Sequence, residues 1–215
     1  MASVALSSKA VGSIVKLNVG GVAKNFIVVH QGRPSSLYDT SCDGTWLLME
    51  DCYESKRWHS SNVNDYANSE IRSYLNSTFL NLFDANIKSA IKQVKLPYRA
   101  GSGYGTTITS GANGLSTKIF LLSGPEVNWT SSTHSYIPND GACLSYFSGC
   151  ATTDAKRIAK LNGSAVVAPL SLLQLQLRRH ARPARLHQWQ LEPQLLPQLV
   201  WHPPRFGTSL FSLGL

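Results

Sequence analysis

The amino-acid composition of this chain changes abruptly after Ala165, and that change limits the part that can fold. Residues 1–165 hold 12 Asn and all eight Tyr, whereas residues 166–215 hold neither type and contain 13 Leu, six Gln and six Pro. Prolines at that density interrupt helices and sheets, and the leucines follow no sustained helical or strand period. We therefore predict a single, incomplete domain over residues 1–165 and a disordered tail over residues 166–215.

The net charge divides at the same boundary. The chain of 215 residues has a formal charge of +8, from 20 Lys and Arg against 12 Asp and Glu. Residues 1–165 hold 15 basic and 11 acidic side chains, a balance of +4, and the tail adds another +4 with five Arg and one Glu. The basic character that would suggest a polyanionic partner is therefore concentrated in the tail.

The length and apolar content suit one domain with a hydrophobic core. No run approaches the roughly 20 consecutive apolar residues that span a bilayer, and Met1 to Ala10 lacks both a basic flank and an apolar core. We expect neither membrane insertion nor a classical signal peptide.

Several short segments before Ala165 have the alternation of β-strands. Gly12–Val19 alternates apolar and polar residues, and two glycines then lead into Val22–His30 with its apolar run Phe26–Val29, which predicts a hairpin. Thr45–Glu50 is a third candidate strand, Lys118–Leu122 is a fourth, apolar enough to be buried, and Cys143–Phe147 is a short fifth.

Residues 64–96 have a helical period instead. One predicted helix has a common face made by Ile71, Tyr74, Leu75 and Phe79. A second, capped by Asp84, has a face made by Ile87, Ile91 and Val94. We expect the two helices to cover one side of the sheet, which places the chain in the α+β class.

The order and spacing of many segments resemble those of one particular family. They are Gly12–Asn18, Asn25–Gly32, Ser36–Asp39, Gly44–Leu48, Trp58–Asn62, Tyr74–Asn76, Ala90–Tyr98, Lys118–Val127, Leu144–Phe147 and Lys156–Ala165. Over residues 10–165 the chain resembles an uncharacterised domain-of-unknown-function family of gut bacteria and their phages. Its closing motifs are similar to those of C-type-lectin-like and formylglycine-generating-enzyme-like domains. The resemblance implies a C-type-lectin-like mixed sheet with two helices.

The closing motifs of that family are absent from this chain. The family continues with Trp-Trp-Leu-Arg-Ser-Pro and ends with Tyr-Gly-(Ile or Val)-Arg-Pro-Ala. When the tail is back-translated and read one nucleotide later, Val166–Leu170 allow Trp-Trp-Leu-Arg-Ser and Val200–Phe206 allow Tyr-Gly-Ile-Arg-Pro-Ala. We therefore predict a frame slip just after Ala165, with loss of the closing strands and an exposed sheet edge. The alternative is a genuinely divergent tail.

The resemblance implies a non-catalytic recognition domain of a phage tail or bacterial surface protein, which binds a cell-surface glycan or protein through loops. We expect it on the virion or the cell surface after synthesis in the cytoplasm. Trp129 and Tyr136, in a polar stretch, are the predicted ligand-binding rim, whereas Trp46 and Trp58 are expected in the core. One alternative is a relative of formylglycine-generating enzymes, and another is a nucleic-acid-binding protein with a basic tail.

Candidate metal ligands and reactive thiols are few. His30, Cys42, Cys52 and His59 are the nearest to a metal set, but nine residues separate the two cysteines, unlike the close spacing of structural zinc sites. We expect no metal and no cofactor. Cys143 and Cys150 enclose six residues and are either a disulfide, in an oxidising compartment, or inert thiols.

The remaining motifs favour structural interpretations. Gly101–Gly105 precedes no helix that could hold a phosphate, so we expect a surface loop. No Gly-x-Ser-x-Gly motif occurs, and we expect no catalytic activity. Arg178–Arg185 is the best nucleic-acid candidate, but no aromatic platform accompanies it. A set of acidic residues is expected to form a solvated face; it comprises Asp39, Asp43, Glu50, Asp51 and Glu54.

Overall fold

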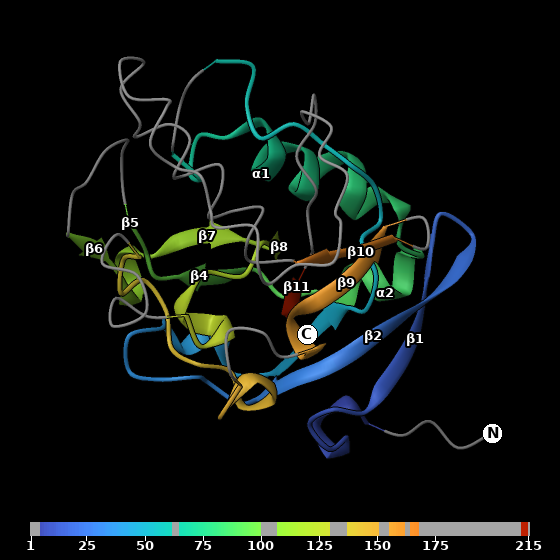
Figure 1. Ribbon diagram of the computed structural model, residues 1–215, viewed down its shortest axis with the longest axis horizontal. Helices are drawn as coiled ribbons and strands as arrows, with labels where there is room; N and C mark the ends of the chain where they lie inside the picture. Colours follow the sequence, from blue (N-terminus) through green and yellow to red (C-terminus); the bar gives the residue numbers. More distant parts are fainter. Residues whose placement is uncertain are drawn as a thin grey trace, which may run out of the picture.

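A computed structural model describes most of the chain before Ala165 and two short segments near or beyond it (Figure 1). The described residues are 5–61, 65–99, 107–129, 137–150, 155–161, 164–167 and 212–214. Figure 1 shows the long β1–β2 hairpin at one end of the molecule and the small β5–β6 pair at the opposite end.

The main sheet has five strands in the order β1-β2-β3-β11-β8, and every neighbouring pair is antiparallel. Its strands are β1 (Ile14–Val19), β2 (Val22–Gln31), β3 (Thr45–Met49), β8 (Ile119–Phe120) and β11 (Ser212–Gly214).

Three antiparallel pairs accompany the main sheet among the described residues. They join β4 (Val94–Leu96) to β7 (Leu115–Thr117), β5 (Tyr98–Arg99) to β6 (Ile108–Thr109), and β9 (Ile158–Leu161) to β10 (Ser164–Val167).

The helical region runs as one segment followed by a separate short helix. The first segment is α1 (Glu70–Tyr74), a π-helical turn η3 (Leu75–Phe79) and a 3-10 turn η4 (Leu80–Leu82), and the second helix is α2 (Ala85–Ala90). Further 3-10 turns are η1 (Leu6–Ser8), η2 (Thr40–Cys42), η5 (Gly111–Asn113), η6 (Pro125–Val127), η7 (Ser145–Phe147) and η8 (Ala155–Arg157).

The predicted hairpin is confirmed. Val19 pairs with Val22, and the intervening Gly20 and Gly21 have φ angles of 60° and 77°. Two consecutive left-handed residues are what the commonest two-residue hairpin turn needs, and glycine adopts that conformation without steric cost. The third strand and the buried fourth strand are confirmed as β3 and β8.

The predicted helices cover one face of the main sheet, as expected. Alternate strand residues such as Phe26, Val28 and Leu47 point to that face and pack against Ile71, Leu75 and other helical residues in one apolar cluster. The α+β class is therefore confirmed.

The opposite face of the sheet is covered by turns and loops instead of helices. Ile27, Trp46 and Phe120 belong to a second cluster, which also contains residues from the segments that follow β8, such as Trp129 and Leu144. Side chains on the two faces alternate along β2, β3 and β8, as they must in pleated strands that are buried on both sides.

Two details of the predicted elements are wrong. Cys143–Phe147 contains the 3-10 turn η7 and no strand, because Leu144 and Phe147, three positions apart, are both buried on one side of the turn. Val94 lies in β4 and not in the second helix. The buried side chains of Val94 and Leu96 alternate with the half-buried Lys95, which is the period of a strand, and all three residues pair with β7.

Asp84 is at the N-cap position of α2, as predicted. Its carboxylate makes no capping hydrogen bond to the helix and instead accepts one from Asn18 Nδ2 at 3.1 Å.

The closing part of the sheet also differs from the prediction. β10 extends past Ala165 to Val167 in a hairpin with β9, and β11 lies between β3 and β8. Because β3 and β8 do not pair with each other, their facing backbone groups need a partner, which Ser212–Gly214 supplies. The other residues of the tail lie outside the described residues.

Among the helices of the described residues, none combines the length and the apolar character that crossing a membrane requires.

Candidate functional site

A cavity of about 90 Å³ opens near the β5–β6 end of the molecule. Its walls combine aromatic rings, aliphatic side chains and two carboxyl groups. The lining residues are Trp58, Tyr66, Leu96, Pro97, Tyr98, Arg99, Leu115, Leu121, Leu122, Ser123, Glu126, Pro138 and Asp140.

Glu126 is the most deeply buried charged residue of this cavity, with 3% of its surface exposed. It lies on η6, directly after the Pro125 that starts the turn. Its Oε1 accepts a hydrogen bond from Tyr38 Oη at 2.8 Å, and its Oε2 accepts one from the Ser123 backbone N–H at 2.7 Å. Burial nevertheless raises the pKa of Glu126 to about 7.

Asp140 supplies the second carboxyl group. Burial raises its pKa to about 7, although the nearby Arg99 charge acts in the opposite direction. The charge of Asp140 also raises the pKa of Glu126, so ionisation of one carboxyl disfavours ionisation of the other. Within the described structure, Asp140 Oδ1 is shielded from solvent and accepts no hydrogen bond.

Tyr38 and Gly141 hold the two acidic segments together. The Tyr38 hydroxyl donates to Glu126 and accepts a hydrogen bond from the Ala142 backbone N–H at 3.0 Å. A Cβ atom on Gly141 would lie 2.5 Å from Ser123 Oγ and 3.1 Å from Tyr38 Oη. Only glycine therefore lets the segment after Asp140 approach Glu126 so closely.

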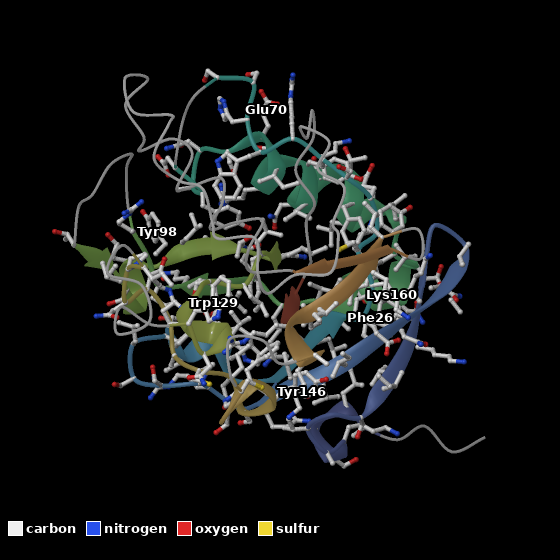
Figure 2. The ribbon with its side chains drawn as sticks, in the orientation of Figure 1. Phe26, Glu70, Tyr98, Trp129, Tyr146 and Lys160 are labelled. Atoms are coloured by element: carbon white, nitrogen blue, oxygen red, sulfur yellow. The ribbon has the colours of Figure 1, made fainter. Side chains whose placement is uncertain are left out.

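The aromatic wall comes from three different segments. The rings of Trp58 and Tyr66 lie 5.7 Å apart between centroids, at an angle of 42°. Tyr66 Oη accepts a hydrogen bond from the Leu121 backbone N–H at 3.2 Å, which anchors the ring to the strand segment. Tyr98, on β5, is half-buried and lies toward the β5–β6 end in Figure 2.

The structure does not place the predicted binding rim at the surface. Trp129 is 3% exposed and belongs to a core cluster, and the Arg157 guanidinium carbon lies 5.6 Å from its ring centroid. Figure 2 shows it among packed interior side chains. The polar residues around Trp129 suggest an exposed position. The large apolar surface of its own side chain favours burial instead. Tyr136 lies outside the described residues.

The two tryptophans predicted in the core have different environments. Trp46 is 1% exposed, and its Nε1 donates to the carbonyls of Gly32 and Cys42. Trp58 is only half-buried and lines the cavity, where it contributes to the aromatic wall.

The described residues, which include His30, Cys42, Cys52 and His59, contain no group of three or more His, Cys, Asp or Glu suited to a metal ion. Cys42 Sγ donates to the Lys95 carbonyl at 3.2 Å, and burial raises the pKa of the Cys42 thiol to about 11. His30 Nδ1 lies 2.8 Å from Ser145 Oγ, and His59 Nδ1 accepts a hydrogen bond from the Ser61 N–H. Burial raises the pKa of Cys52 to about 11 as well.

Cys143 and Cys150 are both thiols in the structure, the first exposed and the second buried. The predicted acidic face is divided among separate contacts. Asp39 caps η2, Glu50 accepts a hydrogen bond from Asn25, and Glu54 accepts one from Tyr74. The segments Gly101–Gly105 and Arg178–Arg185 lie outside the described residues.

One protein family matches this sequence over residues 43–192, and its description is Domain of unknown function (DUF6273). The chain belongs to this family. The predicted membership of an uncharacterised family is thereby confirmed at that level, and the match continues past Ala165 into the tail. No curated protein and no solved structure matched the chain. All residues that line the cavity fall within the family region.

The sequence interpretation missed both carboxyl groups of the cavity. Glu126 is the single charged residue in the mostly apolar run from Ile119 to Val127, and this isolation was the available clue. Asp140 stands in a polar Asn-Asp-Gly stretch that is typical of an exposed turn. Only the fold brings the two residues to one cavity.

Proposed function

We propose that this chain is a non-catalytic ligand-recognition domain that binds a glycan or protein through the cavity at Glu126 and Asp140. One observation carries the proposal: aromatic rings, the buried carboxyl group of Glu126 and the half-buried side chain of Asp140 converge on one small cavity in a packed scaffold. Binding sites commonly combine apolar and aromatic walls with a few placed polar groups. The resemblance to proteins of gut bacteria and their phages supports a location on a phage tail or a bacterial surface.

Binding is favoured over catalysis by the surroundings of the carboxyl groups. Glu126 already accepts hydrogen bonds on both oxygens and is almost fully buried, which limits its access to a reacting bond. The thiol chemistry of a formylglycine-generating enzyme needs a reactive thiolate. Burial raises the pKa of Cys143, which disfavours that form.

The test is a binding screen of the full chain against immobilised glycans and bacterial surface proteins, with Tyr98→Ala as the cavity variant. Tyr146→Ala is the matched control, because Tyr146 is also half-buried but lies far from Tyr98 in Figure 2. We expect Tyr98→Ala to weaken binding by about tenfold and the control to bind as the unmodified chain does. Recovery of a chemically altered ligand, or equal binding by both variants, would contradict the proposal.

A further inference from the structure

We infer that the cavity takes a primary ammonium group at the end of an unbranched alkyl chain, the chemistry of a lysine side chain on a partner protein. This inference rests on the proposed function, because it names the ligand class of the same cavity. Three features of the site support it: its charge, its unpaired hydrogen-bonding atoms and its size.

The charge of the cavity calls for a cation. Glu126 and Asp140 form no ion pair within the described structure, where the two ion pairs are Lys56–Glu54 and Arg57–Glu70. Arg99 lines the same cavity, but its nitrogens do not come within 4.0 Å of either carboxylate. With both carboxyls ionised and Arg99 positive, one negative charge remains uncompensated. Buried charges are strongly destabilising unless they are paired.

Two polar atoms at the cavity also lack partners among the described residues. They are Asp140 Oδ1, which can only accept a hydrogen bond when ionised, and Ser123 Oγ, which can accept or donate. Both residues line the cavity. An ammonium group carries three N–H donors and could satisfy both oxygens at once. A hydroxyl group carries one donor and could satisfy only one of them.

The size of the cavity favours a chain over a ring. Its volume of about 90 Å³ corresponds to roughly three water molecules. That space suits the end of an alkylammonium chain better than a pyranose ring with its hydroxyl groups. The rings of Trp58, Tyr66 and Tyr98 would surround the chain, and aromatic faces attract an ammonium ion. Among the two partner classes of the proposed function, these dimensions favour a protein.

The binding of such a cation should depend on pH. The groups that face the cavity are Glu126 on η6, Asp140 in the segment after Pro138, Tyr98 and Arg99 on β5, and Tyr66 before α1. The pKa values of Glu126 and Asp140 are both about 7, so near neutral pH each carboxyl is partly protonated. A cation binds the ionised form, so its affinity rises with pH through this range and its binding releases protons.

The direct test is an NMR titration of the full chain at about pH 8 with n-butylammonium and with butan-1-ol, its neutral analogue. We expect n-butylammonium to shift the Trp58 and Tyr98 signals and to bind at least about tenfold more tightly than the alcohol. Nα-acetyl-lysine methylamide should bind similarly to n-butylammonium. Cyclohexylammonium, which carries the same fully charged ammonium on a six-membered ring, should not bind.

Two variants sharpen the test. Asp140→Asn keeps the shape of the side chain and removes its charge, so it should weaken n-butylammonium binding by about tenfold. Arg99→Gln removes a like charge, so it should strengthen the same binding several-fold, an effect that general damage to the fold would not produce. Equal affinity for amine and alcohol, tighter binding of cyclohexylammonium than of n-butylammonium, or weaker binding by Arg99→Gln would overturn the inference.

The two proposals can fail separately. A screened ligand that depends on Tyr98 but carries no amine would leave the recognition function standing and overturn the ammonium assignment. If no screened ligand depends on Tyr98 and n-butylammonium shifts no cavity signal, both proposals are wrong.

Discussion

The buried side chain of Glu126 is held by the fold and also lines the proposed binding cavity. Tyr38 and the Ser123 backbone both donate hydrogen bonds to its carboxylate, yet burial keeps its pKa near 7. Asp140 has a similarly raised pKa. In an unfolded chain both groups would ionise near their ordinary values, close to 4. The folded chain therefore retains protons that the unfolded chain has already released.

This difference predicts that stability falls as pH rises. The contribution of each carboxyl is fully present below its unfolded pKa and is lost as pH rises through the folded pKa near 7. We expect the free energy of unfolding in urea to decrease by about 1–3 kcal/mol between about pH 5 and about pH 7.5. Asp140→Asn should make this decrease smaller. A free energy that rises over the same interval would contradict the assignment of raised pKa values.

At the scale of elements, the Asn76 side chain adds hydrogen bonds between the helical segment and β8 to the apolar packing of the helices on the sheet. Its Oδ1 accepts hydrogen bonds from the backbone N–H groups of Lys118 and Ile119 at 2.7 and 3.1 Å. Its Nδ2 donates to the Ile119 carbonyl at 2.8 Å. β8 pairs with β11 on one side and is the last strand of the sheet, so Asn76 satisfies backbone groups that a further strand would otherwise pair.

Asn76→Ala should destabilise the fold by about 2–3 kcal/mol, because it leaves several buried backbone groups without a partner. Asn81→Ala is the matched control, since Asn81 accepts only an exposed hydrogen bond from Lys88 and should change stability by less than about 0.5 kcal/mol. Urea unfolding of the two variants provides the comparison. Equal stability of the two would show that Asn76 does not join helix and sheet as described.

The elements differ in how far the sequence could predict them. The β1–β2 hairpin and the helical segment follow from local signals, namely the glycine pair and the spacing of Ile71, Leu75 and Phe79. The turn η7 and the position of β11 depend on contacts distant in sequence, which periodicity does not encode. The cavity also depends on contacts distant in sequence. The residues around Glu126 and Asp140 indicate only an isolated acid in an apolar segment and a surface turn.

For the whole molecule, the main question is how the last part of the chain completes the sheet. β11 lies between β3 and β8 and pairs with both, so the most C-terminal described strand occupies an interior position of the main sheet. The frame slip that we predict after Ala165 replaces the family's closing motifs. The nucleotide sequence around codon 165 tests that prediction, because inserting or deleting a single base there should restore the Trp-Trp-Leu-Arg-Ser motif.

Ending the chain after Phe211 should destabilise the whole domain, because the facing backbone groups of β3 and β8 lose their partner. We expect a lower melting temperature and a less cooperative transition by circular dichroism. A chain extended by Gly-Ser after Leu215 is the control and should melt like the unmodified chain. If the truncated chain also melts unchanged, β11 does not contribute to the sheet.

The ionisation of the two cavity carboxyl groups can be followed through the carboxyl ¹³C chemical shifts of Glu126 and Asp140. Measured against pH, they should give pKa values of about 7 without ligand, and lower values when Nα-acetyl-lysine methylamide is present. Titration of both carboxyls near pH 4, unchanged by the lysine derivative, would contradict both the buried site and its proposed ligand.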